Sequence, residues 1–169
     1  MFTLINVGLV VKEHYRTLLQ DAKILFIIVP FFFIPISLSV FFIWVDKLLT
    51  YESTSALLTA FAILTGLLFN VIFILFGIVS SNNEHDKNPK RQLLLEHLYT
   101  NSMYALLVST VVLIVLIGVA IGGIWIRDGQ EGGRIAAILS AIIYFGIFHF
   151  ISTLLMVFKR LYVLLFPQI

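Results

Sequence analysis

The side chains that could support catalysis or metal binding are few and scattered. The four histidines are His14, His85, His97 and His149, and none has the His-Glu-x-x-His spacing of a zinc site. The chain has no cysteine, which excludes disulfides and thiolate ligands. No nucleophile elbow is visible, and the glycine-rich stretch 127–134 lacks the Lys-Ser/Thr ending of a phosphate loop. We therefore expect no enzyme, no catalytic residue, no metal and no cofactor.

Two polar side chains stand inside long apolar runs that contain no Asp or Glu. Asn70 lies near the middle of 56–79, and His149 lies in 135–158. A polar group in hydrocarbon needs a hydrogen-bond partner, so each should face another helix. Asn70 either bonds helices together or lines a pore. His149 is either a neutral, hydrogen-bonded residue or a group with a proton or ion role.

The composition predicts that these runs cross a membrane. The chain is 60% hydrophobic and 12% charged, with a mean hydropathy of +1.07. Soluble domains are about 25% charged, so the apolar excess must face lipid. We expect one all-α domain over residues 1–169, an integral membrane four-helix bundle. Its expected spans are about 24–45, 56–79, 103–126 and 135–158.

The segment before the first span has a helical pattern. Apolar residues recur at helical spacing over 1–23, with charged residues on another side. This predicts an amphipathic helix at the cytoplasmic interface or against other helices, either as a plain lead-in to the first span or as a lipid-sensing or partner-docking helix. In the first span, Pro30 and Pro35 each remove a backbone donor and predict a kink.

The interval 80–102 is the one long polar stretch of the chain. Asn88-Pro89 is typical of a helix start, and nothing interrupts a helix from there towards Trp125. At 1.5 Å per residue this helix is longer than a bilayer core of about 30 Å, so we expect a projecting cytoplasmic hairpin. It is either a solvated hairpin packed on the preceding helix or a docking surface. Its predicted partner-binding residues are Lys90, Arg91, Leu94, Leu95 and Leu98.

Small residues in the third span predict a close helix contact. Gly118 and Gly122 form a Gly-x-x-x-Gly pattern. Packing within the chain and packing between copies explain the pattern equally well.

The distribution of basic residues predicts the orientation. Lys12, Arg16 and Lys23 precede the first span, Lys87, Lys90 and Arg91 lie between the second and third, and Lys159 and Arg160 follow the fourth. The opposite side has Lys47, Arg127 and Arg134. The positive-inside rule then places both termini and the hairpin in the cytoplasm.

Two segments carry a family resemblance. They are Leu-Leu-Phe-Asn-Val-Ile-Phe-Ile-Leu at 67–75 and Arg-Gln-Leu-Leu-Leu-Glu-His-Leu-Tyr-Thr-Asn-Ser-Met-Tyr-Ala at 91–105. With the length and helix layout, they resemble small four-helix membrane proteins of bacterial anti-phage defence systems, such as the Kiwa membrane subunit. The resemblance implies a homo-oligomer in the bacterial inner membrane with a soluble cytoplasmic protein partner. It implies no catalytic residues.

Three functional hypotheses follow. The leading one is a defence-system subunit that acts as a membrane sensor and anchor or as a membrane-perturbing effector. An alternative is a small ion channel or transporter subunit with Asn70, His149, Ser109 and Thr110 along its path. A third is a structural assembly subunit of a membrane complex. The net charge of +2 is too small to indicate direct binding of nucleic acid.

Overall fold

The fold is built from helices. The computed structural model describes residues 7–21, 24–82, 89–122 and 134–165, and every regular element among them is helical. The sequence prediction of an all-α chain is therefore confirmed for this part of the protein. The predicted amphipathic helix is α1 (Val7–Asp21).

Three long helices dominate the structure. They are α4 (Tyr51–Asn82), α5 (Pro89–Gly122) and α6 (Arg134–Leu165). Each is long and apolar enough to cross a membrane, and they correspond to three of the four predicted spans. The 34 residues of α5 extend over about 51 Å, more than the roughly 30 Å core of a bilayer. The predicted helix towards Trp125 is present as far as Gly122, and 123–125 lie outside the described residues.

The predicted first span, which was expected to be kinked at Pro30 and Pro35, is divided into consecutive helical segments. The described chain forms α2 (Ile24–Ile28), a five-residue π-helical turn η1 (Val29–Phe33) and α3 (Ile34–Trp44). Its longest uninterrupted apolar part, Val29–Trp44, falls short of the length of the three long helices, so three described helices rather than four qualify individually as spans. Pro30 and Pro35 lie within this part, and the two missing amide donors account for the π turn at η1.

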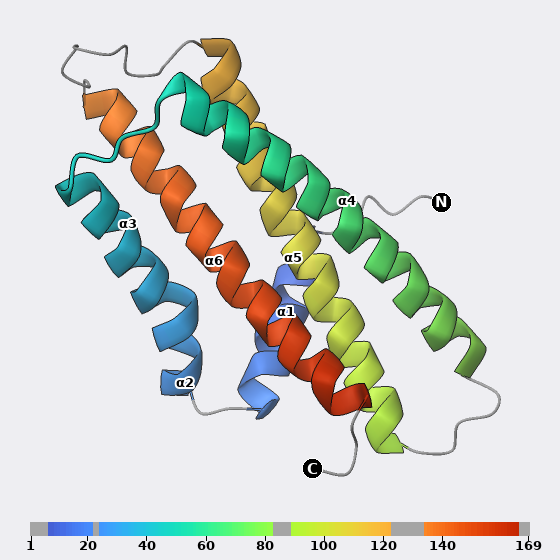
Figure 1. Cartoon of the computed structure of the whole chain (residues 1–169). Helices are drawn as coiled ribbons and strands as arrows, with labels where there is room; N and C mark the ends of the chain where they lie inside the picture. Colours follow the sequence, from blue (N-terminus) through green and yellow to red (C-terminus); the bar gives the residue numbers. More distant parts are fainter. Residues whose placement is uncertain (1–6, 22–23, 83–88, 123–133, 166–169) are drawn as a thin grey trace.

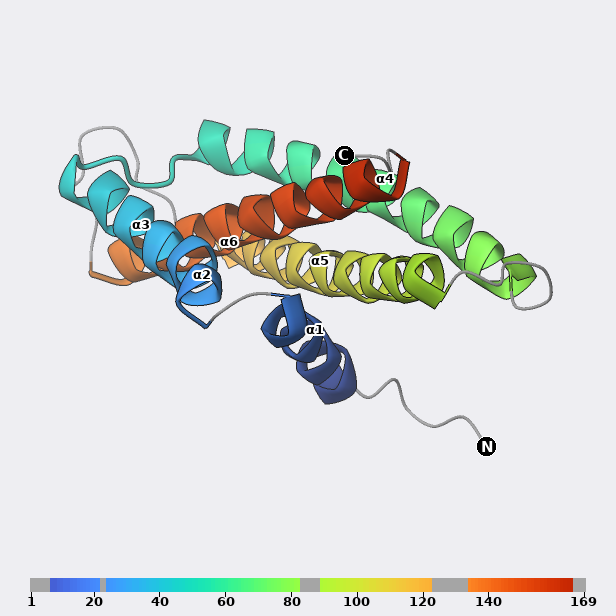
Figure 2. The same ribbon diagram turned by 90° about the horizontal axis from the view of Figure 1, so that it is seen from below.

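The helices lie side by side in the order α3, α6, α5, α4, as Figures 1 and 2 show. Helix α1 lies outside this layer and packs against α5 and α2. The ends of α4 and α6 and the starts of α2 and α5 share one end of the molecule. The predicted hairpin therefore occupies that end, with 83–88 outside the described residues.

The apolar core is divided into three clusters. The largest lies between α4, α5 and α6 and contains Phe61, Leu116 and Phe150. A second holds Leu75, Leu95, Leu98 and Val157 at the hairpin end. The third joins α1 to α2 and η1 through Leu18, Ile27 and Phe31. We call the continuous stretch of α2, η1 and α3 the broken helix. The third cluster is small, so polar contacts contribute much of the attachment of α1.

Candidate functional site

The structure separates the two polar residues of the predicted spans. His149 is buried among α6, α5 and the broken helix, with 6% of its surface exposed. Asn70 is exposed on α4 and bonds to no described residue. Asn70 was expected to face another helix, and within the described chain it does not. The two residues therefore do not share one path inside the chain.

The predicted docking leucines lie in the core. Leu95 and Leu98 are 2% and 1% exposed and pack with Leu75 of α4 and Val157 of α6. This agrees with the alternative of a hairpin packed on the preceding helix, because buried leucines are not accessible to a partner. Sequence periodicity identified the apolar side of the helix but not what covers it.

The other predicted docking residues are more accessible. Arg91 is exposed and Leu94 is half-buried at the start of α5, where Leu93 is also 53% exposed. Lys90 belongs to the first turn of α5, and its side chain lies outside the described residues. A docking surface at this end is therefore limited to residues such as Arg91, Leu93 and Leu94.

The glycine pattern of α5 is not at a helix crossing within the described chain. Gly118 and Gly122 are exposed, and a Cβ added at Gly118 would meet nothing within 4 Å. At Gly146, in contrast, α6 packs tightly against α5, because a Cβ there would lie 2.7 Å from Cγ2 of Val112. For Gly118 and Gly122, packing between copies stays a prediction.

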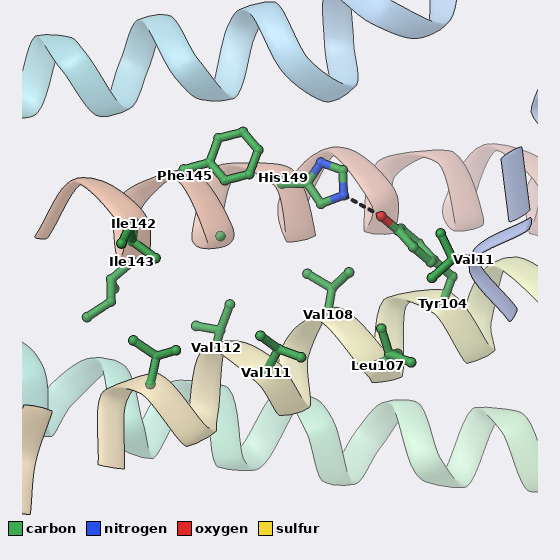
Figure 3. Close-up of a pocket in the computed structure, with 12 residues that line it drawn as sticks. Val11, Tyr104, Leu107, Val108, Val111, Val112, Ile142, Ile143, Phe145 and His149 are labelled. Carbon is green, nitrogen blue, oxygen red and sulfur yellow. Dashed lines mark hydrogen bonds between the residues drawn. The ribbon is translucent and has the colours of Figure 1, made fainter. Parts of the chain in front are cut away.

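His149 is the centre of a buried polar cluster. Its Nδ1 lies 2.8 Å from the carbonyl oxygen of Phe31, and its Nε2 lies 2.9 Å from the hydroxyl of Tyr104 (Figure 3). A carbonyl only accepts, so Nδ1 carries the proton and donates to it. Nε2 then accepts from the Tyr104 hydroxyl. The Tyr104 oxygen lies 3.4 Å from that of Tyr15, which extends the cluster to α1.

The partner carbonyl is available because of a proline. In an α-helix the carbonyl of Phe31 would accept from the amide of residue 35, but Pro35 has no amide hydrogen. The local π turn changes the pairing further, since the amide of Ile34 donates to Val29 rather than to Pro30. His149 supplies the donor that Phe31 lacks. The bond between His149 and Phe31 thus holds α6 against the broken helix beside the two prolines.

A second polar layer joins α1 to α5. His14 Nδ1 lies 2.7 Å from Oδ1 of Asn101, and Asn101 Nδ2 donates to the carbonyl of His97 over 2.6 Å. The hydroxyl of Thr17 lies 2.8 Å from the His14 carbonyl oxygen and 3.3 Å from Asn101 Oδ1. Asn101 Oδ1 accepts, so His14 donates through Nδ1. His14 and Asn101 are both fully buried.

His14 retains one unsatisfied atom. Its Nε2 is buried and has no hydrogen-bond partner, while its ring stacks on Tyr104 with 3.7 Å between centroids. Burial holds the pKa of His14 at about 4, below its usual 6.5, and the positive charge of Arg160 acts in the same direction. The hydrogen bond to Asn101 acts in the opposite direction. His14 is therefore neutral at pH 7 while α1 is docked.

The C-terminal part of α6 adds a buried cation. Arg160 is 7% exposed, and its Nη1 donates to the carbonyl of His97 over 3.2 Å. That carbonyl also accepts from Asn101, so it links α6 to the joint between α1 and α5. The charge of Arg160 was apparent from the sequence, but its burial was not.

An apolar cavity borders the polar cluster. It has a volume of about 280 Å³ and lies between α5 and α6, with Val11 of α1 in its wall. Tyr104 and His149 are at one end of it, and the remainder of the wall is apolar (Figure 3). Because these two groups bond to each other, the cavity offers little polar recognition.

The polar groups form a joint between helices. In the described part of the chain, no group of three or more His, Asp or Glu side chains could hold a metal ion. The donor chain from Tyr15 through Tyr104 and His149 ends at the carbonyl of Phe31, which cannot pass a proton on. These bonds connect α1, α5, α6 and the broken helix.

Comparison with known proteins identified no relative of this chain. No family model, curated protein or solved structure matches the chain. The resemblance to anti-phage membrane subunits therefore stays a prediction.

Sequence reasoning found His149 but missed its partners. Phe31 and Tyr104, which bond to it, lie 118 and 45 residues away along the chain. The second polar layer pairs His14 with Asn101, 87 residues apart. One local signal was present. His97, Asn101 and Tyr104 recur at intervals of four and three, which places polar groups on one face of a helix. That spacing alone does not identify the helix opposite.

Proposed function

We propose that this chain is a non-enzymatic, multi-pass protein of the bacterial inner membrane that perturbs the membrane when its N-terminal helix is released. In this proposal α1 is a control element, docked on the bundle at rest. Release of α1 exposes the surface of α5 and the broken helix that it covers. The bundle then rearranges and the membrane becomes permeable.

One observation carries this proposal: the joint between α1 and α5 contains a buried polar centre. In a protein with 60% hydrophobic residues, α1 buries His14 and Thr17 against Asn101. Polar joints depend on a complete set of partners, since a buried group that loses its partner is costly. Such a joint can be broken by a local change in charge or hydrogen bonding, which an apolar contact resists.

The topology proposal has four spans with both termini in the cytoplasm. The backbone is helical from Ile24 through Trp44, which gives 21 residues and about 31 Å when α2, η1 and α3 are taken together. That length is sufficient for a hydrocarbon core of about 30 Å. Arg91 and Arg160 lie at the same end of the bundle, in keeping with the positive-inside rule.

The defence-system role and the cytoplasmic partner rest on the resemblance. The support from geometry is modest: α5 extends beyond a bilayer core, and its start presents Arg91 and Leu93. A channel or transporter subunit receives less support, because Asn70 is exposed on α4 whereas His149 is buried among other helices. In addition, Ser109 bonds to the Leu106 carbonyl of its own helix.

The test is membrane potential in cells that express the protein. His14→Leu removes the donor to Asn101 and should release α1, so cells with this variant should depolarise while wild-type cells do not. Lys12→Ala is the matched control, since Lys12 is exposed on the same helix. Membrane levels of all three proteins are compared by immunoblot.

Two outcomes would contradict the proposal. The first is an unchanged membrane potential with His14→Leu at wild-type membrane levels. The second is equal depolarisation by wild type and both variants, because α1 would then exert no control. Loss of the His14→Leu protein from membranes is addressed with Asn101→Ala, which removes the same bond from α5.

A further inference from the structure

Asn70 presents an amide where a bilayer provides no partner. It lies within three residues of the midpoint of the apolar run 56–79, on the exposed side of α4. It makes no hydrogen bond to any residue in the described part of the chain. Lipid tails cannot bond to an amide, so the group requires protein on this face.

The residues around Asn70 form a face that allows close approach. Thr59, Gly66, Phe73 and Gly77 are separated from Asn70 by 11, 4, 3 and 7 residues, which places all five on one side of α4. All five are exposed. A Cβ added at Gly66 or Gly77 would meet nothing within 4 Å. We call these five residues the Asn70 face.

A second copy of the chain can supply the Asn70 face with hydrogen-bond partners, which lipid cannot. An Asn side chain has a donor and an acceptor at one tip, so two Asn70 amides related by a two-fold axis can each donate to the other. Gly66 lies one turn from Asn70 and lets the two backbones approach. The face is therefore complementary to itself, and the symmetric arrangement needs no other protein.

We propose that α4 pairs with α4 of a second copy across a two-fold axis, with the Asn70 amides hydrogen-bonded to each other at the centre. This inference rests on the proposed function only in that α4 crosses a bilayer. It is independent of α1, which packs on α5 away from α4. It also differs from pairing through Gly118 and Gly122, which belong to α5.

Cysteine cross-linking in native membranes tests the pairing. The chain has no cysteine, so single cysteines report without background. Phe73→Cys on the Asn70 face should give a disulfide-linked dimer with a mild oxidant. Val71→Cys, exposed on another side of α4, is the matched control and should give little. Ile121→Cys, 84% exposed on α5, reports pairing through α5 instead.

Substitution of Asn70 tests the chemistry. In the Phe73→Cys background, Asn70→Leu should lower the dimer yield roughly tenfold, because a symmetric pair loses both amide bonds. Asn70→Gln keeps a donor and an acceptor and should retain most of the yield. Equal yields for Asn70→Leu and wild type would overturn the inference. So would cross-linking of Val71→Cys or Ile121→Cys at the level of Phe73→Cys.

Extraction of the membranes distinguishes a failure of the α4 pairing from a failure of the proposed function. Membranes are washed with alkaline carbonate before cross-linking, which removes peripheral proteins. If the chain is released, the membrane proposal fails and the pairing fails with it. If the chain stays in the membrane and Phe73→Cys gives no dimer, the pairing alone is overturned.

Discussion

Tyr104 connects the two layers of the polar cluster, so its hydroxyl can be tested by one substitution. Tyr104→Phe removes the donor to His149 Nε2 and leaves that buried atom without its partner. We expect the free energy of unfolding to fall by about 1–3 kcal/mol, the usual cost of an unsatisfied buried group. Denaturant titration of the protein in detergent micelles measures the change.

Tyr15→Phe is the comparison for this substitution. The Tyr15 hydroxyl has only a 3.4 Å contact with Tyr104, and Tyr15 is partly exposed. Its removal should change the free energy of unfolding by less than about 0.5 kcal/mol. Equal effects of the two substitutions would mean that the His149 bond contributes no more than the weak contact.

The buried residues also show how much of the candidate site could be predicted from the sequence alone. An imidazole in an apolar run had to find a partner, and His149 has two. The identity of the partners was not accessible. Phe31 contributes through its backbone, which is free only because residue 35 is proline, and no side-chain pattern reports a free carbonyl. Asn70 shows the opposite case, since its partner is not in the described chain.

At the scale of elements, docking of α1 should depend on pH. Undocked His14 has a pKa near 6.5, and docking lowers that pKa to about 4 because the ring is buried. The docked state thus binds fewer protons, and docking weakens as pH falls below 6.5 until about pH 4. The docking constant should fall roughly thirtyfold from pH 7.5 to pH 5. The neighbours that act on the ring are Tyr15, Tyr104, Arg160 and His149.

Spin labels measure this change. Cysteines at Lys12 and Lys159, both exposed, carry labels on α1 and α6. The distance distribution should broaden to longer values at pH 5 and stay narrow at pH 7.5. In His14→Asn the shorter amide can donate to Asn101 but does not titrate, so its distribution should be the same at both pH values. Equal broadening of the distance distribution at pH 5 in the wild type and in His14→Asn would exclude the imidazole as the cause.

The start of α5 gives a second prediction for an element. Leu98 is 1% exposed in the cluster with Leu75 and Val157, whereas Leu93 is 53% exposed. Leu98→Ala should lower the free energy of unfolding by about 2–5 kcal/mol, and Leu93→Ala by less than about 0.5 kcal/mol. Thermal denaturation in detergent compares them. A large loss with Leu93→Ala would mean that Leu93 is covered by a partner or a second copy.

Helix limits show where the sequence was sufficient and where it was not. Hydropathy located α4, α5 and α6, and the Asn88-Pro89 signal located the start of α5. The sequence did not reveal the π turn at η1. Two prolines predict a kink, but they do not show which donors pair with the carbonyls that lose an amide partner. Nor did the sequence show that the apolar side of α5 at Leu95 and Leu98 is covered by α4 and α6.

At the scale of the whole molecule, the side of the membrane on which α1 lies depends on whether the first helical stretch crosses the membrane. With four spans, α1 lies on the same side of the membrane as the start of α5 and the end of α6. If the stretch from Ile24 to Trp44 does not cross, α1 lies on the opposite side from them. The polar joint holds α1 at the hairpin end of the bundle, where Asn101 and Arg160 are located. This favours four spans.

Labelling of single cysteines in whole cells decides between these arrangements. Lys12, Lys47 and Lys159 are exposed, and they lie before α2, after α3 and near the end of α6. A reagent that cannot cross the inner membrane should label Lys47→Cys from outside and leave Lys12→Cys and Lys159→Cys unlabelled until the cells are opened. Labelling of Lys12→Cys together with Lys47→Cys would show that α2, η1 and α3 do not span. The docking of α1 at the cytoplasmic end would then have to be abandoned, because the membrane would separate His14 from Asn101.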